Sequence, residues 1–225
     1  MLTGLGLVTT INFAYNIAMA RYLGPAGFGH TTVVYTLLVL ISAVTLSFQI
    51  LTAKLVAQQD SANAQHLVYD GLHSRAWLAG SVVSAGLLLF RGGVSGYLNL
   101  GDPLLVVLLA VGASFYVPLG ARRGYVLGTC VFRSLAVNLV LEGLIRFCGS
   151  LLMVNLGFGV RGVIAANAAA VVVAYFALPP KTGIIPNLTA GFPVATGESV
   201  QAAIFFAGQV VINNCDIVLV KHFFP

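Results

Sequence analysis

Long apolar runs dominate the chain and are separated by short joins rich in glycine, proline or charge. A run of about twenty apolar residues is long enough to cross a bilayer as a helix. The third run contains Arg91 and is expected to end there, with the rest at the membrane interface. The pattern predicts an all-α fold, a polytopic membrane helix bundle of about seven transmembrane helices: Leu2 to Ala20, Thr31 to Leu51, Ala76 to Leu98, Leu104 to Ala121, Phe132 to Val154, Val160 to Leu178 and Val200 to Val220.

Composition supports a membrane protein and excludes a soluble domain. Of the 225 residues 59% are hydrophobic and only 8% are charged, with mean hydropathy +0.97. Soluble domains carry about 25% charged residues. The net charge of +5 does not indicate nucleic-acid binding, because the cations are scattered over the joins. Cys130, Cys148 and Cys215 are far apart, so no disulfide framework, metal site or cofactor is expected.

The charges in the joins predict an orientation in the cell membrane. Cytoplasmic loops carry an excess of Lys and Arg. The even-numbered joins are richer in cations, so we expect them, and the amino terminus, to be cytoplasmic. We expect residues 58–74, in the first of these joins, to be a solvated connector or a short helix lying flat on the membrane. The even joins carry Lys54, Arg75, Arg122, Arg123, Arg133 and Lys181, and the odd joins with the tail carry Arg21, Arg91, Arg161 and Lys221.

The start of the chain resembles its end. Tyr15 to Pro25 aligns without gaps on Cys215 to Pro225, so that Asn16 meets Asp216 and Arg21 meets Lys221. Facing duplicated bundles are common in transporters that alternate access between two sides of a membrane. The predicted organisation is residues 1–178 as an amino-terminal lobe of six helices, 179–199 as a cytoplasmic linker, and 200–225 as the first, apparently truncated, helix of a second lobe.

The fifth predicted helix carries polar residues on one face. Ser134, Asn138, Glu142 and Arg146 are four residues apart each time, so they stack along one side. Glu142 precedes Arg146 by one turn, the spacing of a helical ion pair. A lone charge at the bilayer centre costs about 2.5–3.5 kcal/mol on insertion scales, so such residues are candidates for an ion or substrate pathway. The alternative is an ion pair that only locks this helix to its neighbours.

The first and seventh predicted helices also have polar faces. Thr9, Asn12 and Asn16 lie on one side of the first helix, and such faces turn toward a bundle interior or a wet cavity. The seventh helix presents Gln209, Asn213 and Asp216 on one side, and Asp216 is a candidate proton carrier. The alternative is that the polar side chains of both helices only form hydrogen bonds to neighbouring helices.

Two glycine patterns occur in the joins and helix ends, and neither indicates a nucleotide site. Residues 157–162 spell GxGxxG but join two apolar runs and follow no strand, so we interpret them as a turn. Gly120, Gly124 and Gly128 are spaced for close helix packing. The sequence holds no Gly-x-Ser-x-Gly elbow and no HExxH, so an enzyme is not expected.

Three stretches resemble the polysaccharide-biosynthesis (O-antigen flippase) branch of the multidrug/oligosaccharidyl-lipid/polysaccharide flippase superfamily. The first, residues 20–29, is similar to the "AR-x-LG-x-x-x-FG" that ends the family's first helix. The second joins residues 123–128, in the fourth loop, with 140–146, in the fifth helix. The third, residues 213–223, resembles the start of the second lobe.

The resemblance implies a two-lobed protein of twelve or fourteen helices that moves a polyprenyl-diphosphate-linked oligosaccharide across the membrane, usually coupled to an ion gradient. It implies that Arg21 and Arg146 attract the diphosphate and that Glu142 or Asp216 carries the proton. The partners expected are membrane lipid, the lipid-linked glycan and a missing second lobe or dimer partner. Two alternatives remain: a drug/cation antiporter of the same superfamily, and a non-transporting scaffold of a glycan-synthesis complex.

Overall fold

The computed structural model describes residues 2–178 together with residues 201, 204 and 208. The ordered elements of this part are helical, and four of the helices are long and apolar enough to cross a membrane. A fifth crossing is made if α2 and α3, bent by 69° at their junction, are counted as one. The helices are α1 (Leu2–Ala57), α2 (Ala62–Leu89), α3 (Arg91–Tyr97), α4 (Leu104–Gly128), α5 (Phe132–Asn155) and α6 (Gly159–Ala177).

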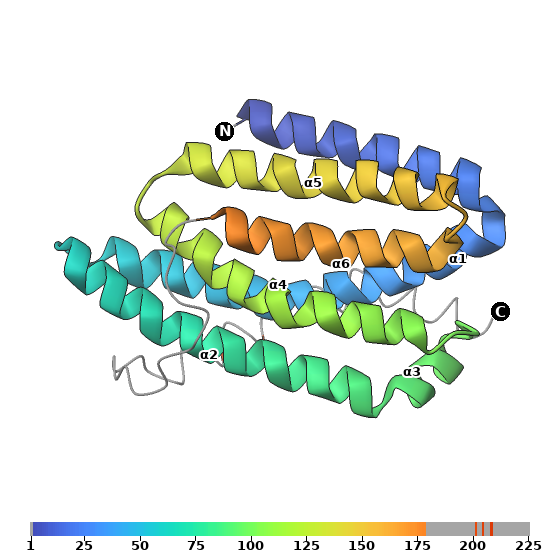
Figure 1. The fold of residues 1–225 in the computed structure, drawn as a ribbon. Coiled ribbons are helices and arrows are strands. Elements are labelled where there is room, and N and C mark those ends of the chain that lie inside the picture. The colour runs from blue at the N-terminus through green and yellow to red at the C-terminus, as the bar shows by residue number, and fades with distance from the viewer. Residues whose placement is uncertain (1, 179–200, 202–203, 205–207, 209–225) are drawn as a thin grey trace.

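Helix α1 is folded back on itself at Gly24. A straight helix of its 56 residues would be about 84 Å long, far more than the bilayer core of about 30 Å. Gly24 has φ 69° and ψ 177°, a conformation that glycine adopts without steric cost, and it divides α1 into a first arm (residues 2–23) and a second arm (residues 25–57) (Figure 1). The predicted join is therefore present.

The second arm starts earlier than predicted. It begins directly at Pro25 rather than at Thr31. Proline suits the first position of a helix, because the N–H it lacks would have no partner there.

Successive segments of the bundle run in alternating directions (Figure 1). The amino terminus, the join between α1 and α2 and the join between α4 and α5 lie at one end, which we call the amino end. The bend of α1, helix α3 and the join between α5 and α6 lie at the opposite end. In that last join Gly157 has φ 86°, and Gly159, with φ 53°, is the first residue of α6, so the GxGxxG stretch begins in the predicted turn and continues as the start of a helix.

Helix α4 packs against the second arm of α1 through a row of glycines. A Cβ placed on Gly120 would lie 2.4 Å from the carbonyl oxygen of Thr45, and one on Gly124 would lie 2.4 Å from that of Gln49. Gly128 approaches Ala53 in the same way, at 2.8 Å. The three contacts are one turn apart on both helices, so the two backbones touch along a little over two turns. The predicted close packing is confirmed.

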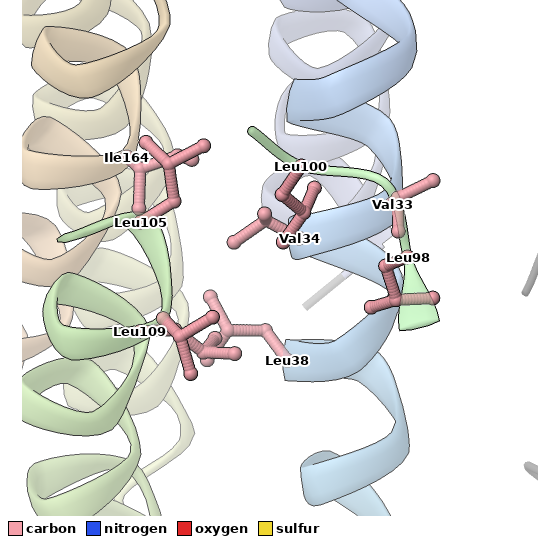
Figure 2. Close-up of a cluster of buried hydrophobic side chains, with 9 residues drawn as sticks. Val33, Val34, Leu38, Leu98, Leu100, Leu105, Leu109 and Ile164 are labelled. Carbon is pink, nitrogen blue, oxygen red and sulfur yellow. The ribbon is translucent and has the colours of Figure 1, made fainter. Parts of the chain in front are cut away.

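Apolar side chains close the bundle at the opposite end. Leu38 from the second arm of α1 reaches toward Leu109 of α4, and Leu105 lies beside Ile164 of α6 (Figure 2). The chain after α3 adds Leu98 and Leu100, both almost fully buried. This cluster fixes α1, α4 and α6 relative to one another, while the polar side chains gather elsewhere in the bundle.

The solvated connector predicted over residues 58–74 is confined to residues 58–61, between α1 and α2. Helix α2 already begins at Ala62, where the Ser61 side chain accepts a hydrogen bond from the Ala64 N–H at 3.3 Å and caps the helix. Val68 and Leu72 are fully buried in the bundle rather than lying on a membrane surface. At its other end α2 stops at Leu89, so the predicted break at Arg91 is confirmed.

Candidate functional site

Seven polar side chains from four helices meet inside the bundle, and we call them the polar seam. The first arm of α1 contributes one, the second arm one, α4 one, α5 three and α6 one. Their contacts join α5 to α1, α4 and α6. The members are Asn12, Tyr35, Arg123, Asn138, Glu142, Arg146 and Asn167.

One half of the seam is built around Arg123 of α4, which is only 6% exposed. Its Nε and Nη2 both donate to Asn138 Oδ1, at 3.0 and 2.9 Å, and Nη2 also pairs with the carboxylate of Glu142. Asn138 Nδ2 donates to the Ala174 carbonyl oxygen of α6 at 2.7 Å. The carboxylate and both ends of the amide therefore have partners, as buried polar groups require.

The other half of the seam is built around Arg146, which lies one turn beyond Glu142 on α5. Arg146 Nη1 donates to the Tyr35 hydroxyl at 3.2 Å, and Nη2 donates to Asn12 Oδ1. The guanidinium carbon lies 5.4 Å from the ring centres of Tyr15 and Tyr35, within cation–π range. Its described partners are therefore neutral or aromatic, in contrast to Arg123.

The prediction of a Glu142–Arg146 ion pair is wrong. Glu142 pairs with Arg123 of the neighbouring helix instead. Arg146 extends toward α1, where Asn12 and Tyr35 bind it. Spacing within α5 indicated which side chains share a face, and the structure does place Asn138, Glu142 and Arg146 toward the bundle, but contacts with α4 and α1 decide the partners.

A small cavity lies between the two halves of the seam. Its volume is about 30 Å³, and its lining includes Tyr35, Tyr116, Glu142, Arg146 and Asn167. Asn167 is 4% exposed and its Nδ2 donates to the Tyr15 hydroxyl at 3.4 Å. Thus α5 and α6 face each other here across polar groups rather than across a sealed apolar contact.

Two predicted residues of the first arm, Asn16 and Arg21, do not join the seam. Ile11, Tyr15 and Met19, spaced four apart, are buried and form the inward stripe of this arm. Asn16 follows Tyr15 by one residue, about 100° further around the helix, and is exposed. The prediction that Asn16 faces the interior of this bundle is therefore wrong.

Arg21 lies on the outer surface of the first arm. It lines an open hollow of about 740 Å³ together with Phe13, Ile17 and Tyr22. Arg21 is thus separate from Arg146, and the structure does not bring the two predicted cations together.

Arg122, expected in a cytoplasmic loop, is a buried residue of α4. It is 3% exposed, and its Nη1 donates to the carbonyl oxygens of Tyr175 and Leu178 at 2.7 and 3.1 Å. These carbonyls belong to the end of α6, where backbone acceptors lack helical partners and favour a cation. The guanidinium also lies 3.8 Å from the centre of the Tyr175 ring. Arg122 therefore joins α4 to the end of α6.

The burial of Arg122 and Arg123 removes the excess of cations on which the predicted orientation rested. Arg75 lies midway along α2 rather than in a join, so among the described residues Lys54 and Arg133 remain at the amino end against Arg21, Arg91 and Arg161 at the opposite end. The cytoplasmic amino terminus stays a prediction.

Aromatic side chains from α2, α4 and α6 surround Tyr175. The Tyr175 hydroxyl accepts a hydrogen bond from Trp77 Nε1 at 3.2 Å and lies 3.0 Å from His73 Nε2. The His73 ring stacks on both Tyr69 and Tyr175. His73, expected to be in a solvated connector, is therefore part of the packing that anchors α2 to α6.

Three members of the seam, Arg123, Tyr35 and Asn167, were not among the residues predicted from the sequence. A signal existed for Arg123, because the glycine row extends to Gly128 and so predicts that this helix continues past Ala121. No comparable signal marked Tyr35 or Asn167, which stand singly within apolar runs.

Three predicted site residues, Gln209, Asn213 and Asp216, lie outside the described residues, as do the linker and most of the seventh predicted helix. Within the described part of the chain no group of three or more His, Cys, Asp or Glu side chains could hold a metal ion. No protein-family model, curated protein or solved structure matches this chain.

Proposed function

We propose that this chain is the amino-terminal part of a transporter that moves a polyprenyl-diphosphate-linked oligosaccharide across the cell membrane. In this proposal each arm of α1, the α2–α3 pair, α4, α5 and α6 cross the membrane, giving six crossings, and residues 200–225 start the second lobe. The amino end is cytoplasmic. The proposal rests on the family resemblance of the sequence together with the polar seam.

The observation that carries the proposal is the excess of positive charge in the seam. Arg123 and Arg146 contribute two cations, whereas Glu142 contributes one anion and is already paired with Arg123. Arg146 is held by the neutral side chains of Asn12 and Tyr35. A charged side chain at membrane depth is costly and is a functional candidate by default. A diphosphate is the kind of anion that such a cation attracts.

Glu142 is the proposed coupling acid. A proton on its carboxylate would weaken the charge-assisted contact with Arg123 that joins α5 to α4. Proton binding would thereby change how α5 is held against α4, which is the kind of change that ion coupling needs.

The test is glycan export by full-length variants in source cells from which the gene has been deleted. Glu142→Gln and Arg146→Gln are expected to lower export about tenfold or more, equivalent to about 1.4 kcal/mol or more of barrier. Amounts of protein in the membrane should stay near wild type. Arg161→Gln is the matched control, because Arg161 is an exposed arginine at the opposite end and its ion-pair partner within the described part of the chain is the loop residue Asp102.

Three results would contradict the proposal. Loss of both seam variants from the membrane would assign the seam a structural role, as in a scaffold. Normal export by both variants at normal membrane levels would remove them from the transport pathway. Unchanged export with loss of resistance to cationic drugs would favour the antiporter.

A further inference from the structure

Two buried polar atoms beside the cavity have no hydrogen-bond partner among the described residues. They are Nε of Arg146 and Oδ1 of Asn167. Both residues line the cavity of about 30 Å³ between α5 and α6. Buried polar groups in folded proteins are nearly always paired, either within the protein or with ordered water. The cavity is thus lined by two residues, one with a buried donor and one with a buried acceptor that need a partner.

The size and lining of the cavity select the partner. A cavity needs about 10–15 Å³ to hold one water molecule, and this one has about 30 Å³. Arg146 Nε can only donate and Asn167 Oδ1 can only accept. Water does both, whereas a metal cation cannot accept from Arg146 Nε–H and an anion such as chloride cannot donate to Asn167 Oδ1.

We propose that an ordered water molecule occupies this cavity, accepts from Arg146 Nε–H and donates to Asn167 Oδ1. Ordered waters commonly make about three hydrogen bonds, and Tyr35, Tyr116 and Glu142 line the remaining wall. The water ties Arg146 of α5 to Asn167 of α6 and so extends the Arg146–Asn12 half of the seam from α1 and α5 to α6. This site does not depend on the transport proposal.

Radiolytic hydroxyl labelling of the purified full-length protein tests the site, because buried side chains next to ordered water are modified by radicals formed from that water. Tyr35 and Tyr116 line the cavity, whereas Tyr175 is fully buried with its hydroxyl bonded to protein groups. We expect Tyr35 and Tyr116 to be labelled at least about fivefold faster than Tyr175.

Val171→Leu separates cavity water from solvent that reaches the tyrosines by another route. Val171 lines the cavity, so one added methylene fills the space and should reduce labelling of Tyr116 to half or less. Val163→Leu is the matched control, the same change at a buried position of α6 that does not line the cavity, and it should leave labelling unchanged. Asn167→Leu serves as the second filling variant if Val171→Leu does not fold.

Two outcomes would overturn the proposal. The first is wild-type labelling of Tyr35 and Tyr116 at the slow rate of Tyr175. The second is labelling of Tyr116 that stays at the wild-type rate in a folded Val171→Leu or Asn167→Leu protein.

Discussion

Replacing Gly124 by alanine tests the backbone contact that holds α4 against the second arm of α1. The new Cβ would lie 2.4 Å from the Gln49 carbonyl oxygen and 2.7 Å from Thr52 Cβ. Carbon atoms in good contact are about 3.5–4.0 Å apart. The neighbour at Gln49 is backbone and cannot rotate away, so the two helices must separate along the glycine row.

The magnitude follows from comparison with Gly112, also in α4. A Cβ on Gly112 would lie 3.5 Å from Ala168, an ordinary contact. Both Gly→Ala changes gain about 0.8–1.0 kcal/mol of helix propensity. Overpacking costs about 1–3 kcal/mol and applies at Gly124 alone. We therefore expect Gly112→Ala to be as stable as wild type or more so, and Gly124→Ala to be about 1–3 kcal/mol less stable than Gly112→Ala.

Thermal unfolding in detergent, followed by the loss of monodisperse protein on heating, measures this difference. For a protein of this size about 1 kcal/mol corresponds to about 2–4 °C, so the midpoints of the two variants should differ by about 2–12 °C. A Gly124→Ala midpoint equal to that of Gly112→Ala would refute the backbone contact between α4 and α1.

Two further predictions concern the ends of the bundle. Burial alone would raise the pKa of Asp102, but the Leu104 N–H at 3.0 Å and the Arg161 guanidinium at 2.5 Å lower the pKa below its ordinary value of 3.8. The stability that the Asp102 carboxylate contributes is therefore complete above pH 3.8 and is lost as pH falls through the lower pKa of the folded protein. Acid should thus lower the unfolding midpoint of wild type slightly more than that of Asp102→Asn. Equal acid sensitivity of the two proteins would contradict a stabilising Asp102–Arg161 contact. Cys130 is exposed in the join between α4 and α5, at the amino end of the bundle. In a protein with Cys148 and Cys215 changed to serine, an impermeant maleimide should therefore label Cys130 in inside-out vesicles and not in intact cells. Labelling in intact cells and not in inside-out vesicles would overturn the cytoplasmic assignment of the amino end.

Much of the fold could be predicted from the sequence because long apolar runs have few alternatives to a helix in a bilayer. The predicted boundaries of the fifth and sixth helices agree with α5 and α6 to within one residue. The glycine row predicted a tight helix contact. The predicted helix boundaries were wrong where a helix continues through polar residues, as at the start of α2 and the end of α4. Hydropathy alone cannot tell a polar helical turn from a polar join.

The site was predicted less completely. The stripe on α5 was recognised because Asn138, Glu142 and Arg146 repeat at the helical period. The sequence could not show that Arg123 rather than Arg146 pairs with Glu142, since that depends on which helix lies beside α5. It likewise could not show that Asn16 faces outward while Asn12 reaches Arg146.

The sequence by itself determined that this chain forms apolar helices, where α1 bends, and which face of α5 is polar. These properties are local, because hydropathy, the conformational freedom of Gly24 and the helical period act over a few residues. Only the tertiary structure decided that Arg122 and Arg123 are buried and which helices the polar seam joins. Those outcomes depend on contacts between residues far apart in the chain, which decide the hydrogen-bond partner of each buried charged side chain.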